Sequence, residues 1–512
     1  MFGLLDTKSR KKVAIIEKIF HAKNHSCDQK VLLESLNMTY PTLLSMIDTI
    51  NEDVLRFGYD SFSIRHSPSN QMYSLQLHEN MSVQLLIHAY IRESTKFILL
   101  ELLLTSSFPN LQALANKLHI SYTAIRKDIR ELNQMLDENK MYISTRNGVR
   151  LEGDELGIRL YYSFLFLTVY GGELWPFSYI QYFEISKLLT NCPEEIYIAG
   201  LIDKSMLIHY YIGVHLLRDR QNYLVSQART FDVPLYAPYS EESRHSVEAF
   251  QKDLKHYLPN INGKALCFTT TLLCSVLLAF GSYTSIERVP GFFYSEKTFR
   301  ENDFLDTVLF IGEKVEQQLS TPFSEHEREL LFYSLMCVNY RHFLFNGLSL
   351  NLKSVIIGYM DIERNPRKMH KINHLRPLVR ALLELEELSA LVPFKQAIAS
   401  DYLIIFEKRI DFSKHTRPIK IALLSVISNE TASFDFKSYF SNYYNIIVTN
   451  VLERNIDLFI SDFSLSPQVL TTLRINQPVV YVNTRWVQSD YEKINVKLAE
   501  IATKKLINKR TE

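Results

Sequence analysis

The sequence has almost no net charge and few residues that interrupt helices. Its 57 Lys and Arg nearly balance 56 Asp and Glu, so the formal charge is +1. A strongly basic field over the whole chain is therefore excluded, and any surface that binds nucleic acid must be local. Only 15 Gly and 16 Pro accompany 46% apolar residues, which is typical of an ordered, helix-rich protein. At 512 residues the chain exceeds one hydrophobic core, so about three to five domains are expected.

Cysteine is also scarce, and its spacing forms no recognisable pattern. The five cysteines include no C-x-x-C pair; they are Cys27, Cys192, Cys267, Cys274 and Cys337. Scattered thiols fit neither a zinc site nor a disulfide framework, and they favour a reducing cytosol. We therefore predict a cytoplasmic protein with no metal site and no cofactor.

Signals for export or membrane insertion are missing as well. The opening residues MFGLLDTKSRKK lack the apolar core of a signal peptide. The uncharged stretch Ala265–Ile286 is long enough to cross a bilayer, but Ser and Thr side chains and Gly281 interrupt it. We interpret it as a buried core helix followed by a loop, so no membrane contact is predicted.

Motifs of the common enzyme classes are absent too. The chain contains no G-x-x-x-x-G-K-[ST], G-x-G-x-x-G, H-E-x-x-H or G-x-S-x-G sequence. We therefore predict that the protein is not an enzyme.

What the sequence does contain is an internal repeat. The stretch SLNMTYPTLLSMIDTIN (35–51) matches KLHISYTAIRKDIRELN (117–133) at an offset of 82 residues. Apolar or aromatic residues coincide at Leu36/Leu118, Met38/Ile120, Tyr40/Tyr122, Leu43/Ile125, Ile47/Ile129 and Ile50/Leu132. Internal repetition indicates a duplicated unit. The unit predicted here is a short helix, a tight turn and a second helix.

The second copy has the properties of a DNA-reading helix. Ser121 is a good N-cap for a helix over Tyr122–Leu136. Its buried stripe is predicted to be Ile125, Ile129, Leu132 and Leu136. Arg126 and Arg130 are four residues apart and share a face, with Lys127 beside them. Such a helix can enter the major groove, where guanidinium groups reach guanine or phosphate.

A hairpin is predicted directly after this helix. The segment MYISTRNGVRLEG contains two short strands around Asn147-Gly148, a strong signal for a two-residue turn. A hairpin after a recognition helix forms a wing, and Arg146 and Arg150 would add charge to it. The residues predicted to contact DNA are thus Tyr122, Thr123, Arg126, Lys127, Arg130, Arg146 and Arg150.

The first copy has the same apolar skeleton with a different exterior. Leu44, Ser45 and Asp48 replace the cations of the second copy, although its hairpin retains Arg65 and His66. Without those cations its phosphate contacts should contribute less affinity. We therefore predict two winged helix-turn-helix units, the second dominating DNA binding, joined by one long apolar helix from Ser82 to Thr105.

The remainder of the chain changes character twice. From Leu151 to about Leu391 it reads as helices with aromatic-rich faces, which fit two bundles. From Arg417 strands and helices alternate, which indicates a small parallel-sheet α/β domain. The predicted fold is multidomain and mainly α. Its predicted boundaries are 1–80 and 81–154 for the winged units, 155–285 and 286–400 for the bundles, and 412–512 for the α/β domain.

This order of parts resembles the Mga/AtxA-type transcription regulators. The resemblance is most specific at Ile143–Arg159, where the second unit ends in NGVRLEGDELGIR. It implies that the bundles are phosphotransferase-system regulation domains (PRDs) and that an enzyme IIB-like domain follows them. The carrier cysteine of an enzyme IIB would lie just after the first strand. Here that loop reads SVISNETAS, so phosphocysteine transfer is excluded and a contact or dimerisation role is expected.

The resemblance also implies phosphorylation of bundle histidines by the histidine phosphocarrier of the sugar phosphotransferase system. His209, in MLIHYYIGVHLLR, and His342, in NYRHFLF, are the candidate phosphoacceptors. A phosphoryl group would bring about two negative charges and could shift helix packing or dimer contacts.

The predicted function is a DNA-binding transcription regulator, an activator by resemblance, acting as a homodimer on double-stranded DNA. One alternative is an RNA-binding antiterminator, which the helix-turn-helix repeat opposes. A second is an enzyme or phosphocarrier of the sugar system, which the missing cysteine opposes. A third is a regulator whose PRD-like domains are structural only and are never phosphorylated.

Overall fold

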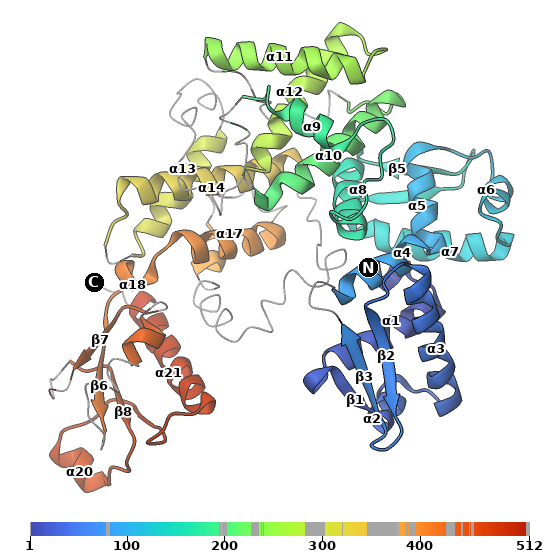
Figure 1. Cartoon of the computed structure of the whole chain (residues 1–512). Helices are drawn as coiled ribbons and strands as arrows, with labels where there is room; N and C mark the ends of the chain where they lie inside the picture. Colours follow the sequence, from blue (N-terminus) through green and yellow to red (C-terminus); the bar gives the residue numbers. More distant parts are fainter. Residues whose placement is uncertain are drawn as a thin grey trace.

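The chain is described by a computed structural model and is mainly helical, with small sheets near the N-terminus and a parallel sheet near the C-terminus (Figure 1). The structure describes residues 2–77, 82–193, 202–226, 240–281, 303–319, 321–345, 378–385, 395–425, 436–441, 444–449 and 455–507, with a few isolated positions between them.

The first repeat unit is a helix pair followed by a hairpin. Its elements are η1 (Phe2–Leu4), α1 (Thr7–Phe20), η2 (Lys23–His25), β1 (Ser26–Asp28), α2 (Gln29–Leu36), α3 (Tyr40–Arg56), β2 (Phe62–Ser67) and β3 (Met72–Leu77). The three strands form an antiparallel sheet in the order β1-β3-β2.

The second repeat unit has the same plan. Its elements, after the connecting helix α4 (Val83–Arg92), are α5 (Thr95–Thr105), α6 (Leu111–Leu118), α7 (Tyr122–Leu136), η3 (Asp137–Asn139), β4 (Met141–Ser144) and β5 (Arg150–Gly153). The predicted bounds of α7 are confirmed, and so is its buried stripe of Ile125, Ile129, Leu132 and Leu136.

Two details of the prediction were wrong. The single helix expected from Ser82 to Thr105 is two helices, because the Ser94 hydroxyl accepts the backbone N–H of Phe97 at 3.2 Å and starts α5 anew. The predicted two-residue turn of the second hairpin is a five-residue loop, since the strands end at Ser144 and Arg150. Val149 leaves the hairpin and instead pairs with Phe108, with N–O distances of 2.9 and 2.6 Å.

The turn between the two helices is built identically in both units. Asn37 ends α2 and His119 ends α6, and both adopt the left-handed conformation, with φ of 48° and 55°. In each case the next backbone N–H closes a C-terminal cap, from Met38 in the first unit and Ile120 in the second. The repeat in the sequence is therefore a repeat in the backbone.

The middle of the chain is helical, as predicted. The elements are α8 (Glu155–Tyr170), α9 (Tyr182–Leu189), α10 (Ile202–Arg220), α11 (Glu241–Tyr257), α12 (Gly263–Ala279), α13 (Asp303–Glu316), α14 (Glu325–Leu344), α17 (Lys395–Arg409) and α18 (Phe412–His415). The predicted boundary between the two bundles, at residues 285 and 286, lies outside the described residues. Within the described part of the chain, no helix is long and apolar enough to cross a membrane.

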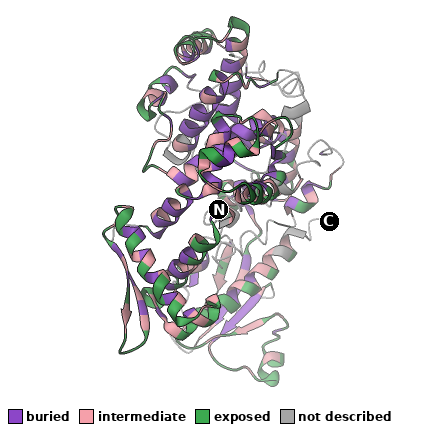
Figure 2. Ribbon diagram, turned by 90° about the vertical axis from the view of Figure 1, so that its right-hand side faces the viewer, coloured by how far each residue is buried: buried purple, intermediate pink, exposed green. Residues whose placement is uncertain are grey.

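The repeat units and the helical middle share one hydrophobic core. A single cluster of buried apolar side chains extends from Leu4 to Ile410. In Figure 2 the buried residues run along the facing sides of the helices, while the outer sides are exposed. Because the side chains are in continuous contact, a shift of the middle helices would also displace the helices of the repeat units.

A buried charge network connects the second repeat unit to the first bundle. Arg159 on α8 is fully buried and donates to Asp219 Oδ1 at 2.7 Å and to Glu155 Oε1 at 3.0 Å. Arg218 on α10 donates to Glu155 Oε2 at 2.7 Å and to the carbonyl of Leu104 at the end of α5 at 3.0 Å. Two arginines and two carboxylates thus satisfy one another away from water.

Histidine 215 completes this network as a neutral acceptor. Its Nδ1 lies 2.6 Å from a guanidinium nitrogen of Arg159, and only the unprotonated nitrogen can accept that hydrogen bond. Burial and the neighbouring Arg159 lower the pKa of His215. Although burial opposes its charge, Asp219 has a pKa well below its usual range because His215 and Arg159 stabilise the carboxylate.

The C-terminal part folds around its own core. Its elements are β6 (Ile419–Leu424), β7 (Ile446–Thr449), β8 (Leu458–Ser461), α20 (Pro467–Thr472), β9 (Val479–Tyr481) and α21 (Gln488–Ile507). The strands pair in parallel in the order β7-β6-β8-β9, so the predicted parallel α/β arrangement is confirmed. One face of the sheet packs on α21 and residues 436–440, and the other on the segment around α20.

Candidate nucleic-acid interface

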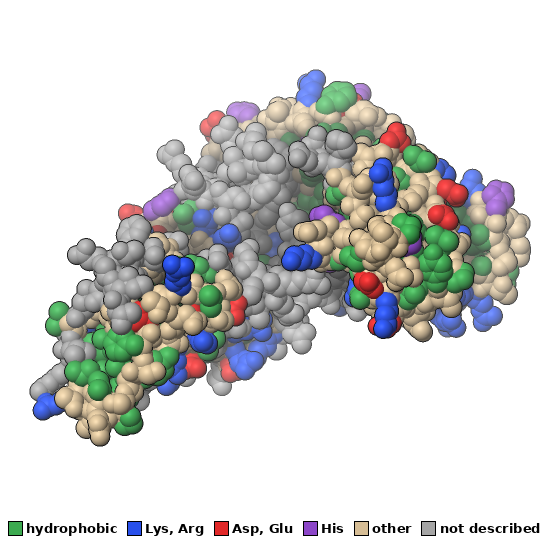
Figure 3. Space-filling model, turned by 60° about the horizontal axis from the view of Figure 1, so that its bottom comes forward, with side chains coloured by type: hydrophobic (Ala, Val, Ile, Leu, Met, Phe, Trp, Pro, Cys, Tyr) green, Lys and Arg blue, Asp and Glu red, His purple; other side chains and the backbone are tan. Residues whose placement is uncertain are grey.

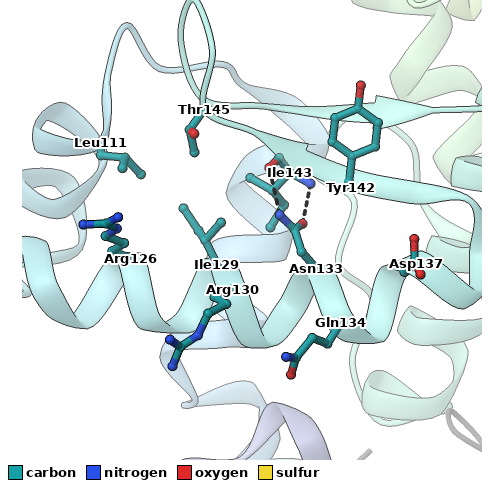
Figure 4. Close-up of a pocket in the computed structure, with 10 residues that line it drawn as sticks. All are labelled: Leu111, Arg126, Ile129, Arg130, Asn133, Gln134, Asp137, Tyr142, Ile143 and Thr145. Atoms are coloured by element: carbon teal, nitrogen blue, oxygen red, sulfur yellow. Dashed lines mark hydrogen bonds between the residues drawn. The ribbon is translucent and has the colours of Figure 1, made fainter.

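A groove separates helix α7 from the wing formed by β4 and β5 (Figure 4). It has a volume of about 500 Å³ and is lined by Leu111, Arg126, Ile129, Arg130, Asn133, Gln134, Asp137, Tyr142, Ile143 and Thr145. Arg126 and Arg130 lie on successive turns of α7 and are both exposed. Two guanidinium groups therefore border a groove that is open to solvent.

The start of α7 presents polar and aromatic groups. Ser121 caps the helix, as predicted, with its hydroxyl 3.2 Å from the backbone N–H of Ala124. Thr123 Oγ1 lies 3.1 Å from that same hydroxyl, and Tyr122 is 45% exposed. The first turn of α7 can therefore offer hydroxyl groups and an aromatic ring to a base edge or a phosphate.

The other predicted cations differ in how their charge is balanced. Lys127 Nζ lies 3.9 Å from Glu131 Oε1, a loose pair at the helix surface. Arg150 Nε donates to Glu152 Oε1 at 2.6 Å, and the Tyr142 hydroxyl donates to the same carboxylate. These two donors lower the pKa of Glu152, which stays anionic and offsets Arg150.

Arg146 lies in the exposed loop of the wing. Arg126 and Arg130 thus both line the groove, and Arg146 lies on the loop of the facing hairpin. Lys127 lies at one side of α7, and Arg150 is bound within the wing.

Asparagine 133 fastens the wing to the recognition helix. Its amide oxygen accepts the backbone N–H of Ile143 at 2.6 Å, and its amide nitrogen donates to the carbonyl of the same residue at 3.1 Å (Figure 4). One side chain therefore satisfies both backbone groups of a strand residue that is 2% exposed. These two hydrogen bonds fix the distance between α7 and β4, and with it the width of the groove.

The first repeat unit contains the same amide clamp. Asn51 accepts the N–H of Ile64 at 2.9 Å and donates to its carbonyl at 3.0 Å. Neither asparagine was predicted to be functional, although Asn51 and Asn133 are the last residues of the two matching stretches. Coincidence of a polar residue in an otherwise apolar repeat is the signal that could have identified them.

The outer face of α3 differs from that of α7 at equivalent positions. Leu44 is 38% exposed where α7 has Arg126, and the exposed Asp48 stands where α7 has Arg130. The two units thus combine one backbone design with opposite surface chemistry. On the face shown in Figure 3, Lys and Arg are interspersed with acidic and apolar side chains, in keeping with a local cationic site.

His209, the first predicted phosphoacceptor, is enclosed in the first bundle. It is 2% exposed, and its Nε2 lies 2.8 Å from Ser186 Oγ on α9. The ring of Tyr182 stacks on its imidazole with centroids 4.1 Å apart, and Trp175 packs against the edge of that tyrosine. Tyr182 is itself 36% exposed, so a partly exposed ring covers one face of the imidazole.

His342, the second candidate, lies on α14 and forms a buried contact with a carboxylate of α17. Its Nε2 lies 2.8 Å from Asp401 Oδ2, which also accepts from Arg341 at 2.7 Å. Burial opposes the charge on Asp401, but Arg341 and His342 lower its pKa to about 2. A negative group added to His342 would therefore meet a carboxylate and compete for its partner.

The segment that forms the interface is similar to a known protein family. Residues 79–166 match the Mga helix-turn-helix domain family. The capsule synthesis positive regulator AcpB of Bacillus anthracis is 27% identical over 140 residues, which are 27% of this chain and 29% of AcpB. The resemblance inferred from the sequence is confirmed for these segments, while the chain matches less than a third of that relative's length.

Replacement of Asn133 by Ala should release the wing from α7. The change removes two hydrogen bonds and leaves the N–H of a buried residue unpaired, at a cost of about 1–3 kcal/mol. Hydrogen–deuterium exchange should then rise in residues 141–153 while the core of α7 stays protected. Asn51→Ala is the matched control and should raise exchange only in residues 62–77. Equal exchange of the second wing in wild type and Asn133→Ala would show that the clamp does not hold it.

Proposed function

We propose that this chain is a DNA-binding transcription regulator that reads duplex DNA mainly through its second repeat unit. The observation that carries the proposal is the groove between α7 and the wing, bordered by Arg126 and Arg130. The match of residues 79–166 to the Mga helix-turn-helix domain supports it. AcpB is described as a positive regulator, and activation is the direction we propose for this chain as well.

In this proposal the parts of the interface have different tasks. In a winged helix the recognition helix enters a groove of the duplex, and the wing lies beside it. A phosphate strand then passes between helix and wing, where Arg126 and Arg130 can neutralise it. Tyr122 and Thr123, at the exposed start of α7, would approach base edges. Arg146 would add a phosphate contact from the wing.

The first repeat unit contributes less to DNA affinity in this proposal. Asp48 would repel a phosphate at the position where Arg130 would attract one, and Leu44 offers no charge. The shape of the interface also disfavours the alternative of an RNA-binding antiterminator. The cationic groove lies beside a helix shaped for a wide major groove, whereas the major groove of an RNA duplex is deep and narrow.

The regulatory part of the proposal concerns His209 and His342. Each is held at an interface between two helices, His209 between α9 and α10 and His342 between α14 and α17. Phosphoryl transfer from the histidine phosphocarrier would place about two negative charges in a packed contact and separate the helices. The alternative, in which the PRD-like bundles are structural only, predicts no labelling at either histidine.

A homodimer is the proposed working form, with the α/β domain as its contact. That domain has a core separate from the rest of the chain, and β7 and β9 are the outer strands of the sheet that its described residues form. Its exposed large apolar side chains are Ile447, Val451, Phe463, Val469, Leu473, Tyr481, Val487 and Val496. Apolar side chains beside open strand edges favour association with another chain.

Replacement of both Arg126 and Arg130 by Ala should weaken DNA binding several-fold to about a hundredfold. The slope of log K against log salt should become shallower by about 0.9 for each lost phosphate contact. Fluorescence anisotropy with a duplex selected by the wild type from a random library measures both quantities. Leu44→Ala/Ser45→Ala is the control from the first unit and should leave the slope unchanged. Damage in the Leu44/Ser45 variant together with normal binding of the Arg126/Arg130 variant would reverse the assigned order of the units, and equal damage in both would contradict it.

Replacement of His209 by Ala should remove phosphoryl labelling by the phosphocarrier from the first bundle. Mass spectrometry under conditions that preserve phosphohistidine measures it. Tyr182→Ala should uncover the imidazole and speed its modification by diethylpyrocarbonate, which reads accessibility without any phosphocarrier. Phe183→Ala, beside it on α9 and 69% exposed, is the control. Full labelling of His209→Ala would exclude this residue as the acceptor, and unchanged reactivity of Tyr182→Ala would exclude the aromatic cover.

Truncation after Asp411 should give a folded protein that is largely monomeric. The cut leaves intact the core that ends at Ile410 and removes the separate core of the α/β domain. Loss of the dimer should weaken binding to paired half-sites, because two linked contacts raise each other's effective concentration. Sedimentation at micromolar concentration tests this prediction. A truncated chain that still dimerises would place the interface in the bundles.

A further inference from the structure

A buried lysine contacts α7 outside the groove. Lys96 lies on α5 and is 5% exposed. Its ammonium group donates to Glu131 Oε2 on α7 at 2.5 Å and to the backbone carbonyl of Gly3 at 3.0 Å. Burial of a lysine is costly unless its charge is paired, so this arrangement has a structural purpose.

The segment around Gly3 lies directly against α7. A Cβ atom added at Gly3 would come 2.7 Å from Met135 Sδ. The next two residues, Leu4 and Leu5, are buried, and Arg10 on α1 donates to the carbonyl of Leu5 at 3.3 Å. Residues 3–5 are thus wedged between the two repeat units and held by cations from both sides.

Glu131 stands between two lysines and is bound tightly by only one. One carboxylate oxygen is 2.5 Å from Lys96, and the other is 3.9 Å from Lys127, a predicted DNA contact. The hydrogen bond from Lys96 lowers the pKa of Glu131, which keeps the carboxylate charged. Without Lys96 this carboxylate would be free to pair with Lys127 and neutralise it.

We infer that Lys96 is a positioning residue that sets the orientation of α7 relative to the first repeat unit and keeps Lys127 available for DNA. The inference rests on the proposed DNA-binding function. It makes DNA affinity depend on a buried contact among α5, α7 and residues 3–5, remote from the groove. Loss of the contact tilts the reading helix and adds a competing anion beside it.

The first repeat unit supplies a matched control. Lys12 on α1 is equally buried and pairs with Asp53 on α3 at 2.5 Å, so it braces the first recognition helix from behind. Replacement of Lys12 breaks a buried ion pair without touching α7, and Asp53 keeps Arg56 and Tyr90 as partners. A comparison of the two lysines therefore separates positioning of the DNA reader from a general loss of stability.

The experiment uses the full chain with Lys96→Met, Lys96→Arg and Lys12→Met. Hydrogen–deuterium exchange should rise in residues 122–136 for Lys96→Met and in residues 40–56 for Lys12→Met. Affinity for a duplex selected by the wild type should fall about three- to thirtyfold for Lys96→Met only. Lys96→Arg should recover part of it, because a guanidinium can serve both acceptors.

Unchanged exchange of α7 in Lys96→Met would overturn the inference. So would an equal loss of affinity in Lys12→Met, which would indicate stability rather than positioning. A wild-type chain that selects no duplex would refute the proposed function instead, and the exchange data would still decide whether Lys96 holds α7. The failures of the two proposals are thereby distinguishable.

Discussion

The buried charge network around Arg159 is the constraint on which the arrangement of the molecule depends. A guanidinium group without solvent contact is tolerated only when carboxylates surround it, and Glu155 and Asp219 provide them. Through Arg218 the same network binds the last turn of α5, the helix that supports the recognition helix. Apolar packing alone would let these helices slide, because it has no direction, whereas hydrogen-bonded charges permit one register.

This network also links the helix that carries His209 to the helix that supports α7. Helix α10 carries His209 near its middle and His215, Arg218 and Asp219 toward its end. Modification of His209, as proposed, would act on a helix whose other end is bonded to the support of α7. The network also requires a neutral His215, because a protonated imidazole could not accept the hydrogen bond from Arg159.

The two repeat units share one backbone structure but expose different side chains. The left-handed residue in the turn and the amide clamp on the wing recur in both, since they satisfy backbone groups that any such unit must pair. The outward residues of α3 and α7 are free of that requirement and differ in charge. The buried lysines also follow this logic, because each braces a recognition helix from a neighbouring helix.

The sequence by itself determined the local features. The 82-residue repeat, the cap at Ser121 and the buried stripe of α7 follow from side-chain chemistry and helical periodicity, which act between near neighbours. Alternation of strands and helices likewise predicted the parallel C-terminal sheet. Which distant groups meet depends on how the chain folds: Asn133 bonds Ile143, Tyr182 stacks on His209, and Lys96 contacts Glu131 and Gly3. The start of a new helix after Ser94 and the pairing of Val149 with Phe108 were also not predicted from the sequence. The reason is physical, since the partner of a buried polar group is selected by three-dimensional packing and leaves no fixed spacing in the chain.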